Sequence, residues 1–375
     1  MPPRKHPTIW KARPHTIAKI AILEDYLKKW FAVMGQTVRK PLVYIDGFAG
    51  PGRYTNHPTG SPIAALRAAQ GSRGACGSRW IAQDTHCVFI EYERDVFDHL
   101  VEHLAPFNGQ SGLHIHPFHD SFEDGLLAGA QREPLILADG IPRFAFIDPF
   151  GPTKASFARV RQLLASPLAE VLVNLDADGI GRILKAGDWS RHESLLTVIF
   201  GDESWRDELT ATDDFRGLCR QVLALYRKKL LAIPRVEFVW SFEMAKKTDS
   251  IDYFLVFASR HPEGMRKMKE SMKRIGQGDE YRFCDAAVGQ EHIDLFSDAD
   301  MDRASDQMRE YFRGKHVAYR DLDLFALKET SYLNPKKMAM RLEKRGLIHV
   351  VAKDGVKRRP NGFKEEEIKV VRFDP

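Results

Sequence analysis

The sequence predicts an α/β fold built on a doubly wound parallel β-sheet, followed by a smaller C-terminal domain. Between residues 41 and 174, short apolar runs of strand character alternate with segments of helical periodicity, which is the order of repeated strand–helix–strand units. Each of these runs is closed by a polar residue. Ligands of open α/β sheets bind at the carboxyl ends of the strands, so these polar residues mark a candidate site. Beyond about residue 297 the chain becomes charged and helical, which indicates the second domain.

The first half of the chain supplies the predicted sheet. An amphipathic helix is expected over residues 15–34, because apolar residues recur there at helical spacing. Strands are expected at residues 41–45, 86–91, 113–118, 144–148 and 170–174, and helices between them at 61–69, 95–104 and 154–165.

The later elements define the expected domain boundaries. Residues 179–234 have a less regular helical pattern, which we interpret as an insertion. Two alternating apolar runs at 235–242 and 251–259 predict an antiparallel hairpin at the sheet edge, and a helix follows over 264–275. We therefore expect an N-terminal helical segment over the ligand site (1–40), a sheet domain (41–296) and a basic C-terminal domain (297–375).

The composition is that of a soluble globular protein. Of 375 residues, 43% are hydrophobic and 29% are charged, and this length suffices for two domains. No apolar run approaches the ~18 residues that span a bilayer. The basic N-terminus is followed by no apolar signal core, so we expect a cytoplasmic protein. The four cysteines are far apart and form no C-x-x-C pair, which argues against a disulfide framework and a zinc site, and we expect no metal.

The glycine-rich segment YIDGFAGPG, which spans residues 44–52, is the most informative motif. It joins an apolar strand to a turn that offers five candidate ligand residues: Asp46, Gly47, Phe48, Gly50 and Gly52. Glycine tolerates positive φ and lets the backbone approach a ligand, while the following helix can point free N–H groups at it. The spacing is neither G-x-G-x-x-G nor a G-x-x-x-x-G-K-[ST] phosphate loop, so it does not indicate a pyrophosphate ligand. A tight turn without a ligand is the alternative.

Glu91 and Asp120 close the second and third predicted strands. In a nucleoside-binding sheet, an acidic side chain after the second strand accepts hydrogen bonds from the ribose hydroxyls, which is the role we predict for Glu91. Asp120 is predicted to bind an adenine amino group, with Phe118 or Phe122 packed on the ring. The alternatives are a solvated or capping carboxylate for Glu91 and a helix N-cap for Asp120.

Asp148, Pro149 and Phe150 follow the fourth predicted strand and are the candidate catalytic residues. A carboxylate at the tip of a buried strand is costly to desolvate, so it needs partners or a task. Asp148, or the carbonyl that proline orients, can accept a hydrogen bond from an exocyclic amine while Phe150 stacks on the base. Arg143 and Lys154 are expected to supply positive charge nearby. The alternative is a strand-terminal turn with a helix cap.

Taken together, these motifs resemble the three-Cys-motif partner protein family. The resemblance covers most of the chain and is carried by Trp10, Pro14 to Thr16, Lys19, the glycine-rich loop, Gly60 to Pro62, Phe89 to Glu91, Ile147 to Gly151, Asp252 to Leu255 and the basic C-terminus. It implies a Rossmann-like class I methyltransferase domain that depends on S-adenosylmethionine (SAM), a winged-helix-like tail, and a companion protein that carries three cysteines. On this basis Lys19 is expected to lie over the methionine end of SAM, and a surface lysine is the alternative.

The Asp-Pro-Phe-Gly segment is also similar to the catalytic strand of tRNA guanine exocyclic-amine methyltransferases. Adenine and cytosine amino-methyltransferases usually carry Asp or Asn followed by two prolines and an aromatic residue, whereas this chain has one proline. No Pro-Cys pair follows the fourth strand, which argues against covalent attack on carbon 5 of cytosine.

The C-terminal domain shows the order helix, strand, basic loop, strand, which is typical of a winged helix. Its candidate nucleic-acid contacts lie on the helix and in the loop: Lys336, Lys337, Arg341, Lys357, Arg358 and Arg359. A solvated charged face is the alternative, because residues 365–367 are all glutamate.

The sequence therefore predicts a SAM-dependent methyltransferase that modifies a nitrogen of a nucleic-acid base, in RNA or DNA. A second hypothesis is a non-catalytic adaptor that senses SAM, binds nucleic acid and acts with a three-cysteine partner protein. A third is a methyltransferase that acts on protein or small molecules.

Overall fold

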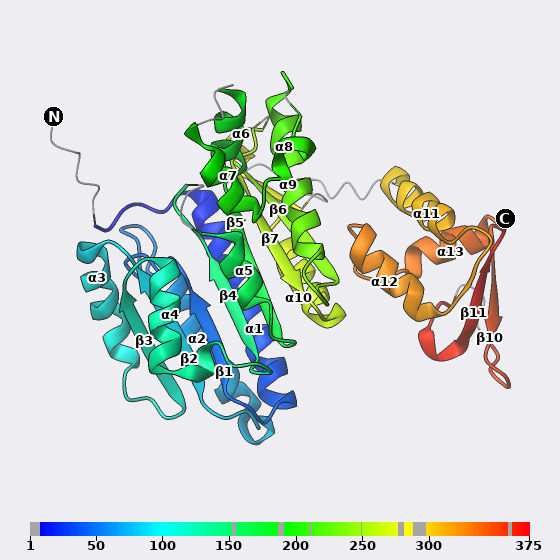
Figure 1. Cartoon of the computed structure of the whole chain (residues 1–375). Coiled ribbons are helices and arrows are strands. Elements are labelled where there is room, and N and C mark those ends of the chain that lie inside the picture. Colours follow the sequence, from blue (N-terminus) through cyan, green and yellow to red (C-terminus); the bar gives the residue numbers. More distant parts are fainter. Residues whose placement is uncertain are drawn as a thin grey trace. The chain divides into compact units, whose positions relative to one another are not determined.

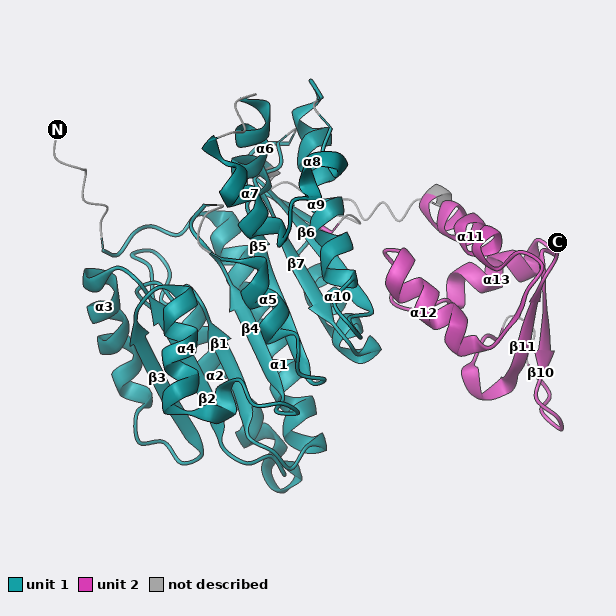
Figure 2. Cartoon of the chain, viewed as in Figure 1, with its two compact units in different colours: residues 1–277, 282–290 teal, residues 278–281, 291–375 magenta. Residues whose placement is uncertain are grey.

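The computed structural model describes residues 8–151, 155–186, 191–210, 212–248, 250–276, 281–287, 298–358 and 362–375. The chain divides into two compact units, coloured teal and magenta in Figure 2. The larger unit comprises residues 1–277 and 282–290, and the smaller one residues 278–281 and 291–375.

The larger unit is built on one eight-stranded sheet (Figure 1). Its strands are β1 (Leu42–Asp46), β2 (Thr85–Glu91), β3 (Leu113–His119), β4 (Arg143–Ile147), β5 (Ala169–Leu175), β6 (Phe238–Ala245), β7 (Tyr253–Ser259) and β8 (Arg282–Cys284). Their order is β3-β2-β1-β4-β5-β7-β6-β8. Strands β1 to β5 are mutually parallel, and β7 runs antiparallel to both β5 and β6. The strand order reverses between β1 and β4, so the ligand crevice of a doubly wound sheet is expected there.

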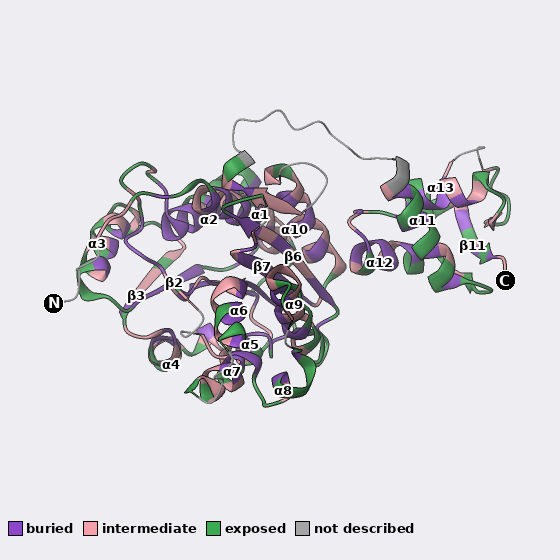
Figure 3. Ribbon diagram, turned by 90° about the horizontal axis from the view of Figure 1, so that it is seen from above, coloured by how far each residue is buried: buried purple, intermediate pink, exposed green. Residues whose placement is uncertain are grey.

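Helices cover both faces of this sheet, as Figure 3 shows. One face carries α1 (Pro14–Thr37), α2 (Ser61–Cys76) and α10 (Pro262–Ile275), with α3 (Arg94–Leu104) beside α2. The other carries α4 (Phe122–Arg132), α5 (Phe157–Leu163), α6 (Ala177–Lys185), α7 (Glu193–Phe200), α8 (Trp205–Glu208) and α9 (Phe215–Leu231). The mixed α/β fold predicted from the sequence is confirmed.

Two details of the sheet differ from the prediction. The predicted antiparallel hairpin is formed by β6 and β7, but it is not the outermost part of the sheet. The edge next to β6 is covered by β8, which pairs parallel to it. A strand of three residues is too short to show an alternating pattern, so the sequence does not reveal it. The helices α6 to α9 are also more than an insertion, since Leu196, Phe200 and Val222 belong to the main hydrophobic core.

Helix α1 is fixed to the sheet by a buried polar contact as well as by its apolar side chains. The hydroxyl of Tyr26 donates to Glu170 Oε2 of β5 at 2.5 Å, and Ser259 Oγ of β7 donates to Glu170 Oε1 at 2.7 Å. All three residues are buried, and burial raises the pKa of Glu170. The two hydroxyls satisfy one oxygen each of a carboxyl group that has little contact with water.

We expect Tyr26→Phe to lower the free energy of unfolding by about 1–3 kcal/mol, because one buried oxygen of Glu170 then lacks its donor. Urea unfolding followed by far-ultraviolet circular dichroism measures this change. Tyr311→Phe is the control, because Tyr311 is 56% exposed. An equal midpoint for Tyr26→Phe and the wild type would show that the contact contributes nothing.

The smaller unit has its own core and sheet. It contains α11 (Asp298–Phe312), β9 (His316–Val317), α12 (Tyr319–Glu329), α13 (Lys336–Lys344), β10 (Ile348–Ala352) and β11 (Ile368–Phe373). The three strands form an antiparallel sheet in the order β10-β11-β9. Met308, Leu322, Leu342 and Val371 are fully buried in its core.

Three further features concern membrane spans, metal ligands and cysteines in residues 8–151, 155–186, 191–210, 212–248, 250–276, 281–287, 298–358 and 362–375. Among them, no helix has the length and apolar character to cross a membrane. Within the same residues, no group of three or more His, Cys, Asp or Glu side chains is placed to hold a metal ion. The four cysteines are buried free thiols.

Candidate functional site

Five neighbouring strands each bring one polar side chain to the carboxyl edge of the sheet. We call this set the polar row. Its members, in strand order, are Glu91 at the end of β2, Asp46 at the end of β1, Asp148 directly after β4, Asn174 near the end of β5 and Tyr253 at the start of β7. The row crosses the point between β1 and β4 where the strand order reverses.

Ring contacts show that the polar row lies on the face that α1 covers. Tyr26 of α1 lies 5.2 Å from Phe144 of β4 and 5.3 Å from Phe257 of β7 between ring centroids, and Phe144 stacks on Tyr44 of β1 at 6.3 Å. Side chains two or four positions along a strand share a face. Asp46, Asp148 and Tyr253 therefore lie on the same face as the rings of Tyr44, Phe144 and Phe257, respectively. Asn174 lies on the same face as Glu170, which bonds to Tyr26 of α1.

Asp46 is a fully buried carboxyl group with weak protein partners. The Tyr44 hydroxyl and the Phe48 N–H lie 3.3 Å from its two oxygens, and its side chain has no exposed surface. Burial raises the pKa of Asp46 to about 7, although hydrogen bonds from Ser61 and Phe48 oppose the effect. A buried carboxylate of this kind is stabilised by a cationic group brought by a ligand.

The glycine-rich loop is held in one conformation by backbone contacts. Gly50 and Gly52 have φ values of 62° and 81°, a region that side chains disfavour. Gly47 donates to the carbonyl of Phe146 at 2.9 Å, and a Cβ on Gly47 would lie 2.6 Å from the Phe122 ring. The predicted glycines thus have distinct roles: two permit the turn, and Gly47 permits close packing.

Glu91 connects the glycine-rich loop to the end of β2. Its Oε2 accepts from the Gly50 N–H and its Oε1 from the Glu93 N–H, both at 2.9 Å. Burial raises its pKa. The Tyr92 N–H is a third backbone donor to this carboxylate. Its two oxygens have about four acceptor positions in all, so one remains for a ligand hydroxyl. Glu91 caps this loop and is not the N-cap of α3, which is Glu93.

Asp120 lies after β3 and is half-buried. Its Oδ1 accepts from the Ser121 N–H at 2.8 Å. The N-cap of α4 is Ser121, whose hydroxyl accepts from Asp124, so the capping alternative for Asp120 is wrong. The aromatic residues Phe118 and Phe122 are buried in the main core, and their rings contribute little exposed surface for stacking.

Asp148 has two partners that are distant in sequence. Lys19 Nζ of α1 lies 2.7 Å from Oδ1 and 2.5 Å from Oδ2, and Asn174 Nδ2 donates to Oδ1 at 2.6 Å. The expectation that Arg143 supplies the positive charge is wrong, because Arg143 begins β4 at the opposite edge and donates to the Ala138 carbonyl. Lys154 lies outside the described residues.

Lys19 is buried between Asp148 and the ring of Tyr253, whose centroid is 5.2 Å from Nζ. It is therefore not a solvated surface lysine. Nearby, His15 Nδ1 pairs with Asp285 Oδ2 at 2.7 Å, which ties the start of α1 to the segment after β8.

Two buried polar atoms of the polar row have no hydrogen-bond partner among the described residues. They are Asn174 Oδ1 and the Tyr253 hydroxyl. In the sequence, Asn174 closes the fifth predicted strand and Tyr253 lies in a segment that carries the family resemblance, but neither residue has a predicted role. The alternating pattern of β7 could have indicated that Tyr253 begins the strand, but not which carboxylate it faces.

Three aromatic rings lie close together at this edge of the sheet. Trp10 is 5.5 Å from Phe150 and 6.0 Å from Tyr54 between ring centroids, in edge-to-face geometry. Phe150 is 62% exposed, which is unusual for a large apolar ring two positions from the half-buried Asp148. Burial raises the pKa of Tyr54, and the charges of Asp148 and Asp46 add to this effect.

The candidate nucleic-acid contacts of the smaller unit differ in their partners. Lys336, Lys337 and Lys357 are exposed. Arg341 pairs with Asp302 at 2.8 Å. Arg358 makes a two-fold ion pair with Glu343 and donates to the Gly362 carbonyl, so its guanidinium holds the loop against α13. Arg359 lies outside the described residues.

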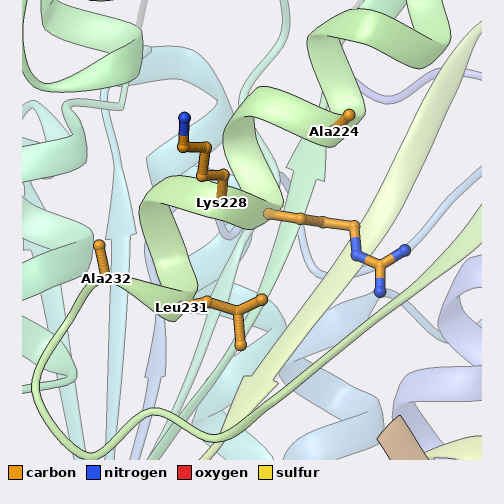
Figure 4. A pocket seen from close by; sticks show the side chains of 5 residues that line it. Ala224, Lys228, Leu231 and Ala232 are labelled. Carbon is orange, nitrogen blue, oxygen red and sulfur yellow. The ribbon is translucent and has the colours of Figure 1, made fainter. Parts of the chain in front are cut away.

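A surface depression on α9 is separate from the polar row. It is lined by Ala224, Arg227, Lys228, Leu231 and Ala232 (Figure 4). These residues lie at the end of α9 that precedes the start of β6, whose first residues pair with the end of β7. That is the edge of the sheet opposite to the polar row, so the depression takes no part in the candidate site.

No protein-family model and no curated protein matches the chain. Solved structures that are similar over part of it include methyltransferases. An O-methyltransferase from Bacillus cereus in complex with S-adenosylhomocysteine (SAH) is 12% identical, with 63% of this chain and 80% of that chain covered and a TM-score of 0.34.

Two further structures of methyltransferases are similar at comparably low identity. The O-methyltransferase TomG from Streptomyces achromogenes, involved in tomaymycin synthesis and solved with SAM, is 16% identical over 64% of this chain and 79% of that chain, with a TM-score of 0.32. The SAH-bound methyltransferase PaMTH1 from Podospora anserina is 12% identical over 62% and 76%, with a TM-score of 0.28. TM-scores this low establish no function for this chain. Its function has to be inferred from its own residues.

Proposed function

We propose that the larger unit is a SAM-dependent methyltransferase that transfers a methyl group to a nitrogen of a nucleic-acid base. The observation that carries this proposal is the polar row, because it aligns Glu91, Asp46 and Asp148 across the switch point of a doubly wound sheet. The antiparallel β7 inside the sheet agrees with the resemblance to class I methyltransferases.

The residues at β1 and β2 fit the chemical groups of SAM. Glu91 retains an acceptor position for a ribose hydroxyl beside its backbone donors. Asp46 is a buried acceptor suited to the ligand's ammonium group. Lys19, Phe48, the backbone of Gly50 and Gly52, and Asp120 remain candidate contacts for the rest of the ligand. SAM, when bound, supplies an electrophilic methyl group.

Asp148, Pro149 and Phe150 are proposed to position the methyl acceptor. Asp148 accepts a hydrogen bond from an exocyclic amine, and the exposed ring of Phe150 stacks on the base. With SAM bound, the amine nitrogen would form a C–N bond to the methyl carbon, and the electron pair of the broken C–S bond would stay on sulfur. Asp148 Oδ2 would take up the displaced N–H proton and release it to water. Uncharged sulfur and a methylated amine are the products.

The smaller unit is proposed to be a winged-helix-like module that contacts nucleic-acid phosphates. Its elements follow the order helix, strand, helix, helix, strand, strand, with α13 as the helix next to the loop that joins β10 and β11. Of the six candidate contacts, Lys336, Lys337 and Lys357 are exposed. A three-cysteine partner protein is part of the proposal through the family resemblance alone.

Charge reversal at the start of α13 tests this surface. We expect Lys336→Glu with Lys337→Glu to weaken binding to a duplex oligonucleotide by at least about tenfold at ~0.1 M salt, because phosphate contacts dominate such affinity. Fluorescence anisotropy measures the effect. Lys364→Glu is the control, because Glu366 and Glu367 already lie within 4.0 Å and 3.7 Å of Lys364. Equal losses for both variants would indicate a general charge effect.

A transfer assay tests the proposed activity itself. The full chain is incubated with tritiated-methyl SAM and total RNA or DNA, with and without the three-cysteine partner. We expect label in nucleic acid, and hydrolysis should recover it on a base nitrogen. Label on protein or on small molecules alone would contradict the nucleic-acid substrate.

A non-catalytic SAM-sensing adaptor is the second candidate. It is favoured by one observation, the ion pair that Asp148 already makes with Lys19, which suits a purely structural carboxylate. The adaptor would bind SAM and nucleic acid but transfer no label in either arm of the assay.

A further inference from the structure

The polar row divides into two halves with different hydrogen-bond status. Asp46 and Glu91, at β1 and β2, have backbone donors. Beyond Asp148, Asn174 and Tyr253 each present a buried polar atom that no described residue satisfies. Buried polar atoms without a partner destabilise a fold and are rare. Asn174 Oδ1 and the Tyr253 hydroxyl lie on adjacent strands close to Asp148. We therefore expect them to bind a ligand.

The orientation of the Asn174 amide is fixed by chemistry. The Asp148 carboxylate can only accept, so the nitrogen that lies 2.6 Å from it must be Nδ2. Asn174 Oδ1 consequently faces away from Asp148 as an acceptor. Tyr253 lies on the same side, since Lys19 Nζ bridges its ring and Asp148. Burial, with a further contribution from Asp148, keeps the pKa of Tyr253 well above its usual value, so its hydroxyl remains a donor.

We propose that Asn174 and Tyr253, with Asp148, form the subsite for the methyl-accepting group, and that this subsite selects a planar base with a primary exocyclic amine. The inference rests on the proposed function and deepens it, because it names the residues that determine which base is accepted. Adenine, cytosine and guanine carry such an amine, whereas uracil does not.

The donors and acceptors of this subsite match such a base. A primary amine has two N–H groups, and Asp148 Oδ2 and Asn174 Oδ1 are two acceptors on adjacent strands. The Tyr253 hydroxyl can donate to the ring nitrogen next to the amine. A site built to hydrogen-bond a substrate N–H rejects strongly an analogue that lacks it. The rings of Phe150, Trp10 and Tyr54 provide stacking surfaces at the same edge.

Binding of nucleotides to the SAH-saturated full chain tests the selectivity. Calorimetric titrations use AMP, CMP, GMP and UMP as probes at millimolar concentration. We expect at least one amine-bearing nucleotide to bind about tenfold or more tightly than UMP. Asn174→Ala should reduce this preference to less than about threefold while the affinity for SAH stays within twofold of wild type.

A pair of tyrosine variants separates binding from stability. Tyr253→Phe removes a hydroxyl without a partner, so it should leave the melting temperature unchanged or raised and weaken the preferred nucleotide about fivefold or more. Tyr26→Phe removes a hydroxyl bonded to Glu170, so it should lower the melting temperature and leave the nucleotide preference unchanged.

Three results would overturn the subsite. They are a wild type that binds UMP as tightly as every other nucleotide, an Asn174→Ala variant that keeps the preference, and a Tyr253→Phe variant that loses stability as Tyr26→Phe does. A wild type that fails to bind SAH would instead overturn the proposed function, because that measurement precedes any nucleotide titration.

Discussion

Replacement of Asp148 by alanine should lower methyl transfer by about two to four orders of magnitude while the affinity for SAH stays within about threefold. In the polar row, Asp148 lies between Glu91 and Asp46, which are proposed to bind the cofactor, and the unpartnered atoms of Asn174 and Tyr253. Its loss removes the acceptor for the amine proton, whereas the contacts around Glu91 and Asp46 remain. Single-turnover transfer of tritiated methyl, together with SAH calorimetry, measures both quantities.

The control for this variant is Asp148→Asn. The alanine variant leaves the Lys19 ammonium buried without its ion pair, so it should also lose about 1–3 kcal/mol of stability. The asparagine variant keeps an acceptor oxygen near Lys19 and should retain more stability, yet it cannot take up the proton. Full transfer activity in Asp148→Asn would assign Asp148 a structural role only.

SAH affinity should fall below pH 7, because the pKa of Asp46 is about 7 in the free protein. Above this pH the carboxylate is charged and accepts from the ligand's ammonium group. Below it, the bound proton must be released, so affinity declines towards tenfold for each further pH unit. Calorimetry between pH 6 and pH 8.5 follows this dependence, and Asp46→Ala should abolish detectable binding throughout.

Asp46→Asn provides the matched control for the pH dependence. It should bind SAH weakly at every pH, with no inflection near pH 7. Burial raises the pKa of Asp46 from 3.8 to about 7, so stability is lost as the pH rises from about 4 to about 7, and the full loss persists above pH 7. The variant should therefore be about 2–4 kcal/mol more stable than wild type at pH 8. An unchanged inflection in this variant would show that another group titrates.

The sequence predicts the sheet and the first half of the site because their signals are local. Strands β1, β2 and β4 are buried along their whole length, so each appears as an apolar run that ends in a single acidic residue. The glycines of the loop are adjacent to Asp46, and their positive φ values follow from the turn that they make.

The partners of Asp148 could not be predicted because they depend on tertiary packing. Lys19 is 129 positions away and Asn174 is 26 positions away. Arg143 is nearer in sequence, but it begins β4 whereas Asp148 follows the end of this strand, so the two residues lie at opposite edges of the sheet. In the same way, Arg358 belongs to a basic run, yet Glu343 neutralises it across the small domain. Charge runs do not reveal such pairs.

A crystal structure of the protein soaked with SAH would show whether the polar row binds the cofactor. We expect the ribose hydroxyls to bind Glu91, the amino group to bind Asp46 beside Gly50 and Gly52, and the sulfur to face Asp148. Density for SAH elsewhere, or none at a concentration that saturates calorimetric binding, would contradict the assignment of the polar row as a methyltransferase site.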